Sequence, residues 1–143
     1  MPSRARILAT TLASSPQGAD HVVVPRTGHF RQDGRVVQMF AIRKTAQLLA
    51  ELQAERRQEG RRFHFVGHQA NLRMLEAVCR QCDVPSDRHH GNVEWFGNTA
   101  GAGAPSVLSM RWDDWADDDD VAVVGVGAGL TWSRYVLRFE AAA

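Results

Sequence analysis

Several residue types are scarce in this sequence, and cysteine is the most informative of them. The chain contains two cysteines, Cys79 and Cys82, three positions apart in a helical pattern. With no second pair, this spacing argues against a four-cysteine zinc site and against a disulfide-stapled secreted domain. Two ordinary thiols on one helix are the simpler expectation, and redox or metal chemistry is the alternative.

Long apolar runs are also missing. No stretch approaches the roughly 18 apolar residues that cross a bilayer, and the start of the sequence lacks a basic segment followed by an apolar core. We therefore expect no membrane span and a cytoplasmic protein. Hydrophobic residues make up 44% and charged residues 23%, as in ordinary globular proteins, and we expect one domain over residues 1–143.

Neither sign of charge is in excess, because the formal net charge is +1 at pH 7. This balance argues against a general nucleic-acid binder and against a membrane-surface protein, although local patches can still steer a charged partner. Lysine is almost absent: Lys44 is the only one, so the basic side chains are nearly all arginines. The planar fork of arginine suits carboxylates and phosphates, so clusters of arginine are informative here.

Hydrophobic periodicity predicts alternating strands and helices. Strands are expected where short apolar runs are bounded by turn residues, at 7–13, 63–66, 92–96, 121–126 and 132–139, with a shorter extended piece at 21–25. Helices are expected from Val36 for about twenty residues, at 71–82, and from the small-residue run 97–108 towards Met110. This alternation is typical of an α/β domain.

Several polar clusters are expected to be solvated. The acidic run 111–120 is expected to be a loop, because its aspartates do not have calcium-loop spacing. His89 and His90 are not expected to hold a metal, since adjacent residues of an extended segment point to opposite faces. Four arginines lie around Gly60 at the end of the first predicted helix: Arg56, Arg57, Arg61 and Arg62. Their positive charge complements the helix dipole, so a solvated helix end accounts for them.

The corner at Gly67 and His68 is the most informative stretch. A buried strand stops at Gly67, His68 follows, and an amphipathic helix begins within about three residues. Open α/β sheets usually place ligands and catalytic groups at such carboxyl ends of strands. Arg73 and Arg80 share one face of that helix, either as a solvated surface or as a docking site for an anionic partner.

Three blocks of sequence stand in this order: His68-Gln69-Ala70-Asn71-Leu72-Arg73, Gly97-Asn98-Thr99-Ala100 and Gly125-Val126-Gly127-Ala128-Gly129-Leu130-Thr131-Trp132. Together they resemble the carboxyl-terminal half of β-ketoacyl-acyl carrier protein synthase III, a condensing enzyme of the thiolase superfamily. The resemblance extends from about Arg6 to Phe139 and includes the helix entry at 33–37. Gly125, Gly127 and Gly129 are not interpreted as a dinucleotide-binding motif, because the pattern predicts a strand after them and that motif requires a helix.

The resemblance implies a thiolase-like half-domain of βαβαβαββ type, with a mixed five-stranded sheet and helices. In that family a cysteine of the amino-terminal half becomes acylated, and the active site lies between the two halves. Neither Cys79 nor Cys82 lies in that nucleophile context, so the amino-terminal nucleophile domain is expected to be absent from this chain. The 143 residues alone should therefore not condense an acyl group.

The resemblance also implies roles for particular residues. His68 and Asn98 match the two donors that bind the malonyl thioester carbonyl and stabilise the enolate formed in decarboxylative Claisen condensation. The backbone N–H of Ala128 matches a donor to the second oxyanion, formed during acyl transfer. These three residues are the expected catalytic and oxyanion groups.

Contacts to the substrate carrier are implied as well. Asn71 matches a pantetheine contact, and Gly34 and Arg35 lie where the pantetheine tunnel is lined, although Arg35 stands in place of the usual asparagine. Arg73 and Arg80 match basic positions that dock acyl carrier protein. The implied substrates are coenzyme A or acyl carrier protein thioesters, with no further cofactor and no metal.

The expected partners follow from the missing nucleophile. The first hypothesis is that this chain forms one half of a synthase III-like acyltransferase of fatty acid biosynthesis. A cysteine-bearing half or subunit would complete it in a homo- or hetero-oligomer. The alternative is a non-catalytic half-domain that binds acyl carrier protein or pairs with a full synthase, since its interior face would otherwise expose an apolar patch.

Overall fold

The computed structural model describes residues 4–141. The strands are β1 (Ala5–Ser14), β2 (Val22–Val23), β3 (Arg31–Gln32), β4 (Arg62–Gly67), β5 (Asp119–Gly127) and β6 (Thr131–Phe139). The α-helices are α1 (Gly34–Arg56), α2 (Leu72–Gln81), α3 (Val93–Phe96) and α4 (Gly103–Met110). Short 3₁₀ helices lie at Pro16–His21, Arg57–Glu59, Ser86–Arg88 and Ala100–Ala102.

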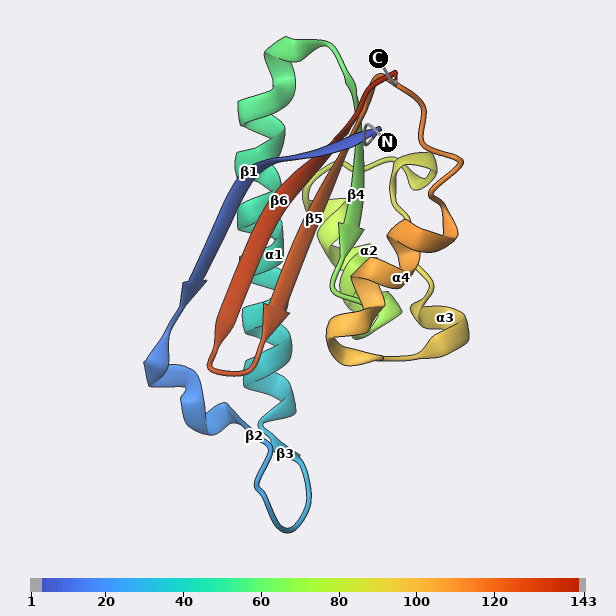
Figure 1. Ribbon diagram of the computed structural model, residues 1–143. Helices are drawn as coiled ribbons and strands as arrows, with labels where there is room; N and C mark the ends of the chain where they lie inside the picture. The colour runs from blue at the N-terminus through green and yellow to red at the C-terminus, as the bar shows by residue number, and fades with distance from the viewer. Residues whose placement is uncertain (1–3, 142–143) are drawn as a thin grey trace.

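The main sheet has the strand order β1-β6-β5-β4. β1 and β5 both pair antiparallel with β6, while β4 and β5 are parallel, so the sheet is mixed as expected. A parallel pair needs a crossover, and the chain between β4 and β5 supplies it through α2, α3 and α4. β2 and β3 form a separate two-stranded hairpin that projects beyond the sheet (Figure 1). The predicted α/β class is confirmed.

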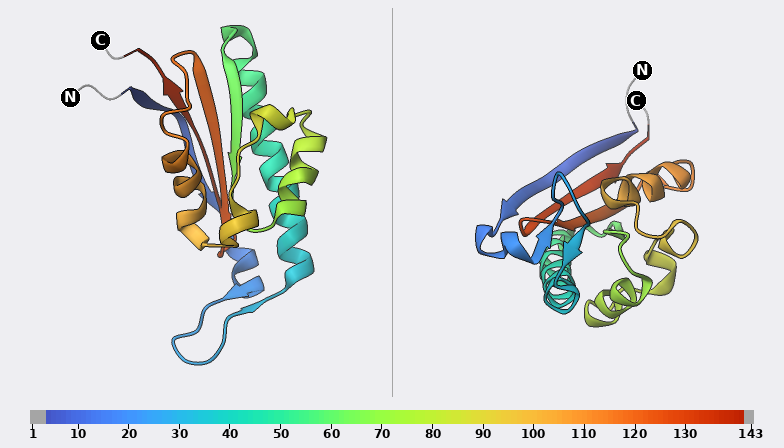
Figure 2. Two further views of the ribbon diagram at one scale, coloured as in Figure 1. Left: turned by 90° about the vertical axis from the view of Figure 1, so that its right-hand side faces the viewer. Right: turned by 90° about the horizontal axis from the view of Figure 1, so that it is seen from below.

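Helices cover both faces of the sheet. α1 and α2 lie on one side and α4 on the other, which Figure 2 shows with the sheet seen edge-on. Alternation along the strands supplies both cores: Phe65 packs with α1 and α2, and the next residue, Val66, packs on the α4 side. No helix among the described residues is long and apolar enough to cross a membrane.

The count of five strands needs a correction. The main sheet has four, and a fifth segment touches it at a single parallel bridge between Phe65 and His89. The predicted strand at 92–96 is the helical turn α3, in which the N–H groups of Trp95 and Phe96 both donate to the carbonyl of Asn92 at 3.1 Å. Of this turn only Val93 is buried, and the N–H groups of Asn92 and Val93 donate to the side-chain oxygen of Gln69, at 2.8 and 3.1 Å, instead of to a neighbouring strand.

The acidic run also differs from the expectation. Asp119 and Asp120 are not in a solvated loop but begin β5 and are buried, at 3% and 1% exposure. Arg61 is not simply solvated either, because it donates to Asp120 at 3.1 Å and to the carbonyl of Phe139 at 2.6 Å. Strand pairing decides this outcome, since it brings the end of the chain against the turn that follows α1.

Asp119 belongs to a second buried cluster with two histidines. His64 and His90 are hydrogen-bonded through their ring nitrogens at 2.9 Å, and Asp119 lies 3.2 Å from the other ring nitrogen of His64. The buried indole of Trp115 packs edge-on against both rings. Burial is the main cause that lowers the pKa of His64 and lowers that of His90 from 6.5 to about 4.

The histidine pair predicts acid sensitivity. Between pH 6.5 and about 4 the unfolded chain binds protons at His90 that the folded chain does not, so stability falls as the pH falls through this window. The expected loss from His90 alone is about 2 kcal/mol at pH 5. Urea unfolding at pH 7 and pH 5 measures it. His90→Gln should flatten this dependence and His29→Gln, in an exposed loop, should not; equal slopes in all three proteins would contradict the prediction.

Candidate active site

A groove of about 840 Å³ lies at the carboxyl ends of β4 and β5. It is lined by one end of β1, the β2–β3 hairpin, the first turns of α1, the corner after β4, the start of α4 and the β5–β6 turn. The lining is largely apolar, with few polar groups, which is typical of a small-molecule site. Five predicted site residues line it: Gly34, His68, Asn71, Asn98 and Ala128.

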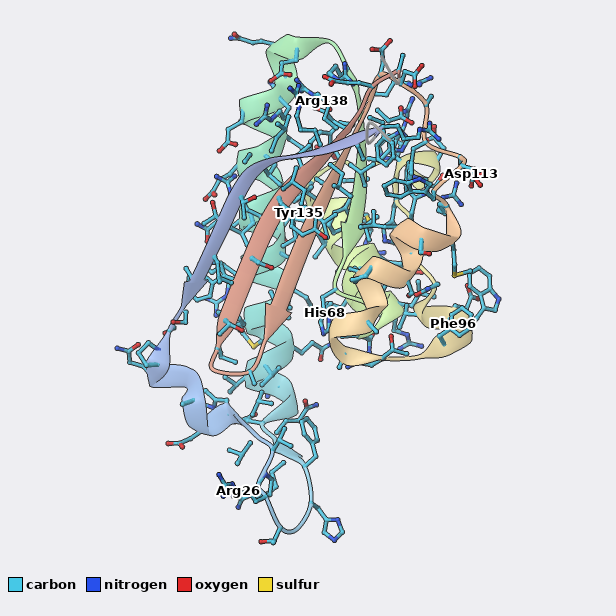
Figure 3. The ribbon with its side chains drawn as sticks, in the orientation of Figure 1. Arg26, His68, Phe96, Asp113, Tyr135 and Arg138 are labelled. Carbon is cyan, nitrogen blue, oxygen red and sulfur yellow. The ribbon has the colours of Figure 1, made fainter. Side chains whose placement is uncertain are left out.

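His68 is held by the backbone of the sheet. Its N–H donates to the carbonyl of Val124 at 2.8 Å, which extends the pairing of β4 with β5 by one residue. Figure 3 shows His68 at the lower end of the main sheet. Gly67 is needed at this corner, because a Cβ there would overlap Leu75 and lie 2.8 Å from the ring of Phe65. Burial lowers the pKa of His68, so the imidazole is neutral at pH 7 and carries one N–H donor.

Asn98 follows α3 in an exposed turn on the same groove. The helical turn ends at Gly97, whose φ of 64° is the left-handed conformation that glycine adopts without strain. The side-chain oxygen of Asn98 accepts the N–H of Ala100 at 2.9 Å. Because its oxygen is engaged, the hydrogens on Nδ2 are the groups that Asn98 offers to a ligand.

Asn71 and Gly34 line the groove at two helix starts. The side chain of Asn71 caps α2 by accepting the N–H of Met74 at 3.2 Å, so it also has a structural role. Gly34 is the first residue of α1, after Asp33, whose carboxylate accepts the N–H of Val36 at 3.2 Å. Both caps bring polar backbone ends to an otherwise apolar groove.

Ala128 lies in the tight turn between β5 and β6. The hydroxyl of Thr131 donates to its carbonyl at 3.0 Å, which closes the turn on one side. Gly129, with a φ of 127°, allows the chain to reverse direction directly after Ala128. The turn places the backbone of Ala128 at the rim of the groove.

Three predicted residues lie outside the lining of the groove. Arg35 is exposed in the first turn of α1, and Arg73 and Arg80 are exposed on α2. The two α2 arginines therefore form the basic stripe that their spacing predicts. Arg35 is the one predicted pantetheine residue that the groove does not include, which matches its departure from the family pattern.

Neither cysteine is suited to nucleophilic chemistry. Cys79 is buried on α2, and burial raises the pKa of its thiol to about 11. Burial and the nearby Asp83 also raise the pKa of Cys82, whose thiol donates to the carbonyl of Ala46. A thiolate is needed for attack, so both groups are inert at neutral pH. Within residues 4–141, no three His, Cys, Asp or Glu side chains are grouped to hold a metal ion.

Sequence reasoning missed one residue of this region. Gln69 is completely buried beside His68 and makes three hydrogen bonds, although glutamine is seldom fully buried. Its only signal in the sequence is its position in the block with His68. A polar residue directly after a buried strand could be solvated as well as buried, so the sequence does not distinguish the two.

Comparisons with known proteins agree with this architecture. Residues 53–139 match the family model described as 3-oxoacyl-[acyl-carrier-protein (ACP)] synthase III C terminal. The β-ketoacyl-[acyl-carrier-protein] synthase III of Staphylococcus saprophyticus is 33% identical over an alignment of 142 residues, which covers 93% of this chain and 44% of the relative. The corresponding protein of Oceanobacillus iheyensis is 31% identical with the same coverage.

Solved structures show the same relationship. The crystal structure of 3-oxoacyl-(acyl carrier protein) synthase III from Pseudomonas aeruginosa superposes with a TM-score of 0.83 and 31% identity, over 96% of this chain and 45% of that chain. The enzyme of Aquifex aeolicus has the same TM-score at 23% identity, which indicates a shared fold. The chain thus spans less than half the length of its relatives and has a thiolase-like fold. Its fold and sequence together place it in the family of carboxyl-terminal domains of 3-oxoacyl-[acyl-carrier-protein] synthase III.

Proposed function

We propose that this chain provides the enolate-stabilising half of a condensing enzyme of the synthase III type. A companion half with a reactive cysteine completes the active site. The observation that carries the proposal is one groove that contains both a neutral imidazole, from His68, and a free amide donor, from Asn98. The family membership of the chain supports the same class of chemistry.

The proposed reaction is decarboxylative Claisen condensation. The thioester oxygen of a malonyl group accepts hydrogen bonds from His68 and from Asn98 Nδ2. When the bond to the carboxylate breaks, carbon dioxide leaves and the electron pair moves into an enolate on that oxygen. Two fixed donors in a largely apolar groove stabilise this charge more than they stabilise the neutral carbonyl.

The enolate carbon then attacks the acyl group on the companion's cysteine. A carbon–carbon bond forms, the tetrahedral oxyanion takes a hydrogen bond from the N–H of Ala128, and the cysteine thiolate leaves. Asn71 and the start of α1 at Gly34 contact the pantetheine arm of the malonyl carrier. In this proposal the substrates are coenzyme A or acyl carrier protein thioesters, and no further cofactor takes part.

Reconstitution tests the proposal. Mass spectrometry of the native material should reveal a cysteine-bearing companion beside the 15.9 kDa chain. Mixing the two with an acyl donor and malonyl-acyl carrier protein should release carbon dioxide and form a 3-oxoacyl product, and neither half alone should do so. A complete mixture that acylates its cysteine but releases no carbon dioxide would contradict the proposal.

Carrier docking gives a second prediction. Arg73 and Arg80 are exposed on one face of α2, beside the corner that holds His68. Charge reversal of both should weaken binding of the acidic acyl carrier protein at least about tenfold and make the residual binding less sensitive to salt. Isothermal titration measures it. A matched control is the pair Arg43→Glu, on α1, and Arg57→Glu, in the 3₁₀ helix that follows α1, which should bind as the parent does. Equal weakening in both pairs would contradict specific docking.

A non-catalytic half-domain is the second candidate function. It is favoured by the two inert thiols and by the uncovered part of the sheet, where Ile7 is 63% and Leu12 79% exposed. Such exposed apolar side chains favour association with another protein. Acyl carrier protein binding without any carbon dioxide release, in the presence of every companion that co-purifies, distinguishes this candidate from the first.

A further inference from the structure

Gln69 connects the two segments that carry His68 and Asn98. Its side-chain nitrogen donates to the carbonyl of Gly67 at 2.7 Å, on its own side of the corner. Its side-chain oxygen accepts two N–H groups from the other segment, of Asn92 at 2.8 Å and Val93 at 3.1 Å. The nitrogen of the Gln69 amide is therefore bonded to the corner at Gly67, and its oxygen is bonded to the segment that begins α3.

The packing around Gln69 leaves no alternative position for its side chain. Gln69 is 0% exposed. A Cβ added at Gly91 would lie 3.0 Å from its side-chain oxygen, and one added at Gly103 would lie 2.7 Å from its Cβ. Gly91 precedes the bonded residue Asn92, and Gly103 begins α4, so the side chain lies among the corner, the start of α3 and the start of α4.

We propose that Gln69 is a positioning residue that fixes the His68 corner relative to the α3 segment ending at Asn98. This inference rests on the proposed function, in which His68 and Asn98 bind the same oxygen. α3 has only four residues and packs a single buried side chain, Val93. Its N-cap, Asn92, also donates to the hydroxyl of Ser106 at 2.8 Å, which ties α3 to α4 but not to the His68 corner. The sheet holds His68 through Val124, and Gln69 is the direct hydrogen-bonded link from that corner to α3.

Energetics favour this role over a simple filling of space. Both segments have backbone groups at this point that are buried from water, and an unpaired buried group costs more than the net contribution of its bond. Without the glutamine amide, the carbonyl of Gly67 and the N–H of Val93 must find other partners. The segments then move apart to admit water, and the donor groups at His68 and Asn98 move with them.

NMR of the whole labelled chain tests the inference without any substrate. Gln69→Met keeps the length of the side chain and removes its three hydrogen bonds. The ring resonances of His68 and the side-chain amide resonances of Asn98 should both shift and broaden, well below the melting temperature. The control is Gln53→Met, which removes the bond from Gln53 to the carbonyl of Cys82 between α1 and α2; it should lower the melting temperature and leave both sets of resonances in place.

A gentler variant keeps the test decisive if Gln69→Met does not fold. Gly91→Ala removes no hydrogen-bonding group but presses on the side-chain oxygen of Gln69, so it should shift the same two sets of resonances by less. A folded variant that leaves His68 and Asn98 resonances as in the parent overturns the positioning role. Because no substrate is present, a failure of malonyl decarboxylation in the reconstituted enzyme would remove the proposed function without touching this result.

Discussion

Replacing His68 with alanine is expected to slow decarboxylation of malonyl-acyl carrier protein by about 10²- to 10³-fold in the reconstituted enzyme. His68 donates a hydrogen bond to an oxygen whose negative charge grows as carbon dioxide leaves. Removing the imidazole therefore reduces the stabilisation of the transition state more than that of the bound substrate. Asn98→Ala should have an effect of the same order. Release of labelled carbon dioxide measures this step directly.

Acylation of the companion's cysteine provides the internal control for both variants. That step does not use the enolate donors, so its rate should stay close to that of the parent enzyme. His29→Ala, in the exposed loop between β2 and β3, should leave both steps unchanged. If His68→Ala and Asn98→Ala slow acylation and decarboxylation equally, these side chains hold the structure together and do not act on the enolate.

Replacing Asp120 with alanine is expected to lower the free energy of unfolding by about 3–5 kcal/mol. Asp120 is 1% exposed and accepts from Arg61 at 3.1 Å and from Arg138 at 2.8 and 2.6 Å. Both guanidinium groups are largely buried, with side chains 19% and 14% exposed. Removing the carboxylate takes away the one buried counter-ion that the two guanidinium groups share, and leaves Arg138 with Glu59 and Arg61 with the exposed Asp118. Two partly uncompensated cations then lie close together, which costs more than the ion pairs themselves contribute.

Asp118 offers a matched control for this prediction. It pairs with the same Arg61 at 3.2 Å, but its side chain is 81% exposed, so Asp118→Ala should change the stability by less than about 1 kcal/mol. Urea unfolding compares the two variants. Arg138 lies at the opposite end of the sheet from His68 (Figure 3), so acyl carrier protein binding by folded Asp120→Ala should be unchanged. Equal losses of unfolding free energy in Asp118→Ala and Asp120→Ala would show that burial does not determine how much each carboxylate contributes to stability.

The order of strands and helices was predictable because it depends on local patterns. β4, α2 and the β5–β6 hairpin follow directly from apolar runs, amphipathic spacing and glycine turns, and all lie close to their predicted bounds. The strand expected at 92–96 failed for a reason that is not local. Its pattern fits a short strand, but the buried amide of Gln69 holds the N–H groups of Asn92 and Val93 at a helix start.

The candidate site was predictable in part. His68 was recognisable from its place after a buried strand, and the blocks around Asn98 and Ala128 from their likeness to one family. The structure adds that these residues line one groove with Asn71 and Gly34.

The sequence by itself determined the class of fold and the family. It also determined that neither cysteine lies where the family has its nucleophile. Only the tertiary structure decided which polar residues are buried. Asp119, Asp120 and Gln69 are residue types that are common in solvated loops. Each is buried here because residues distant in the sequence supply its hydrogen bonds. A local pattern records the period of a helix or strand, whereas burial of a polar group depends on partners that only the packed sheet brings within reach.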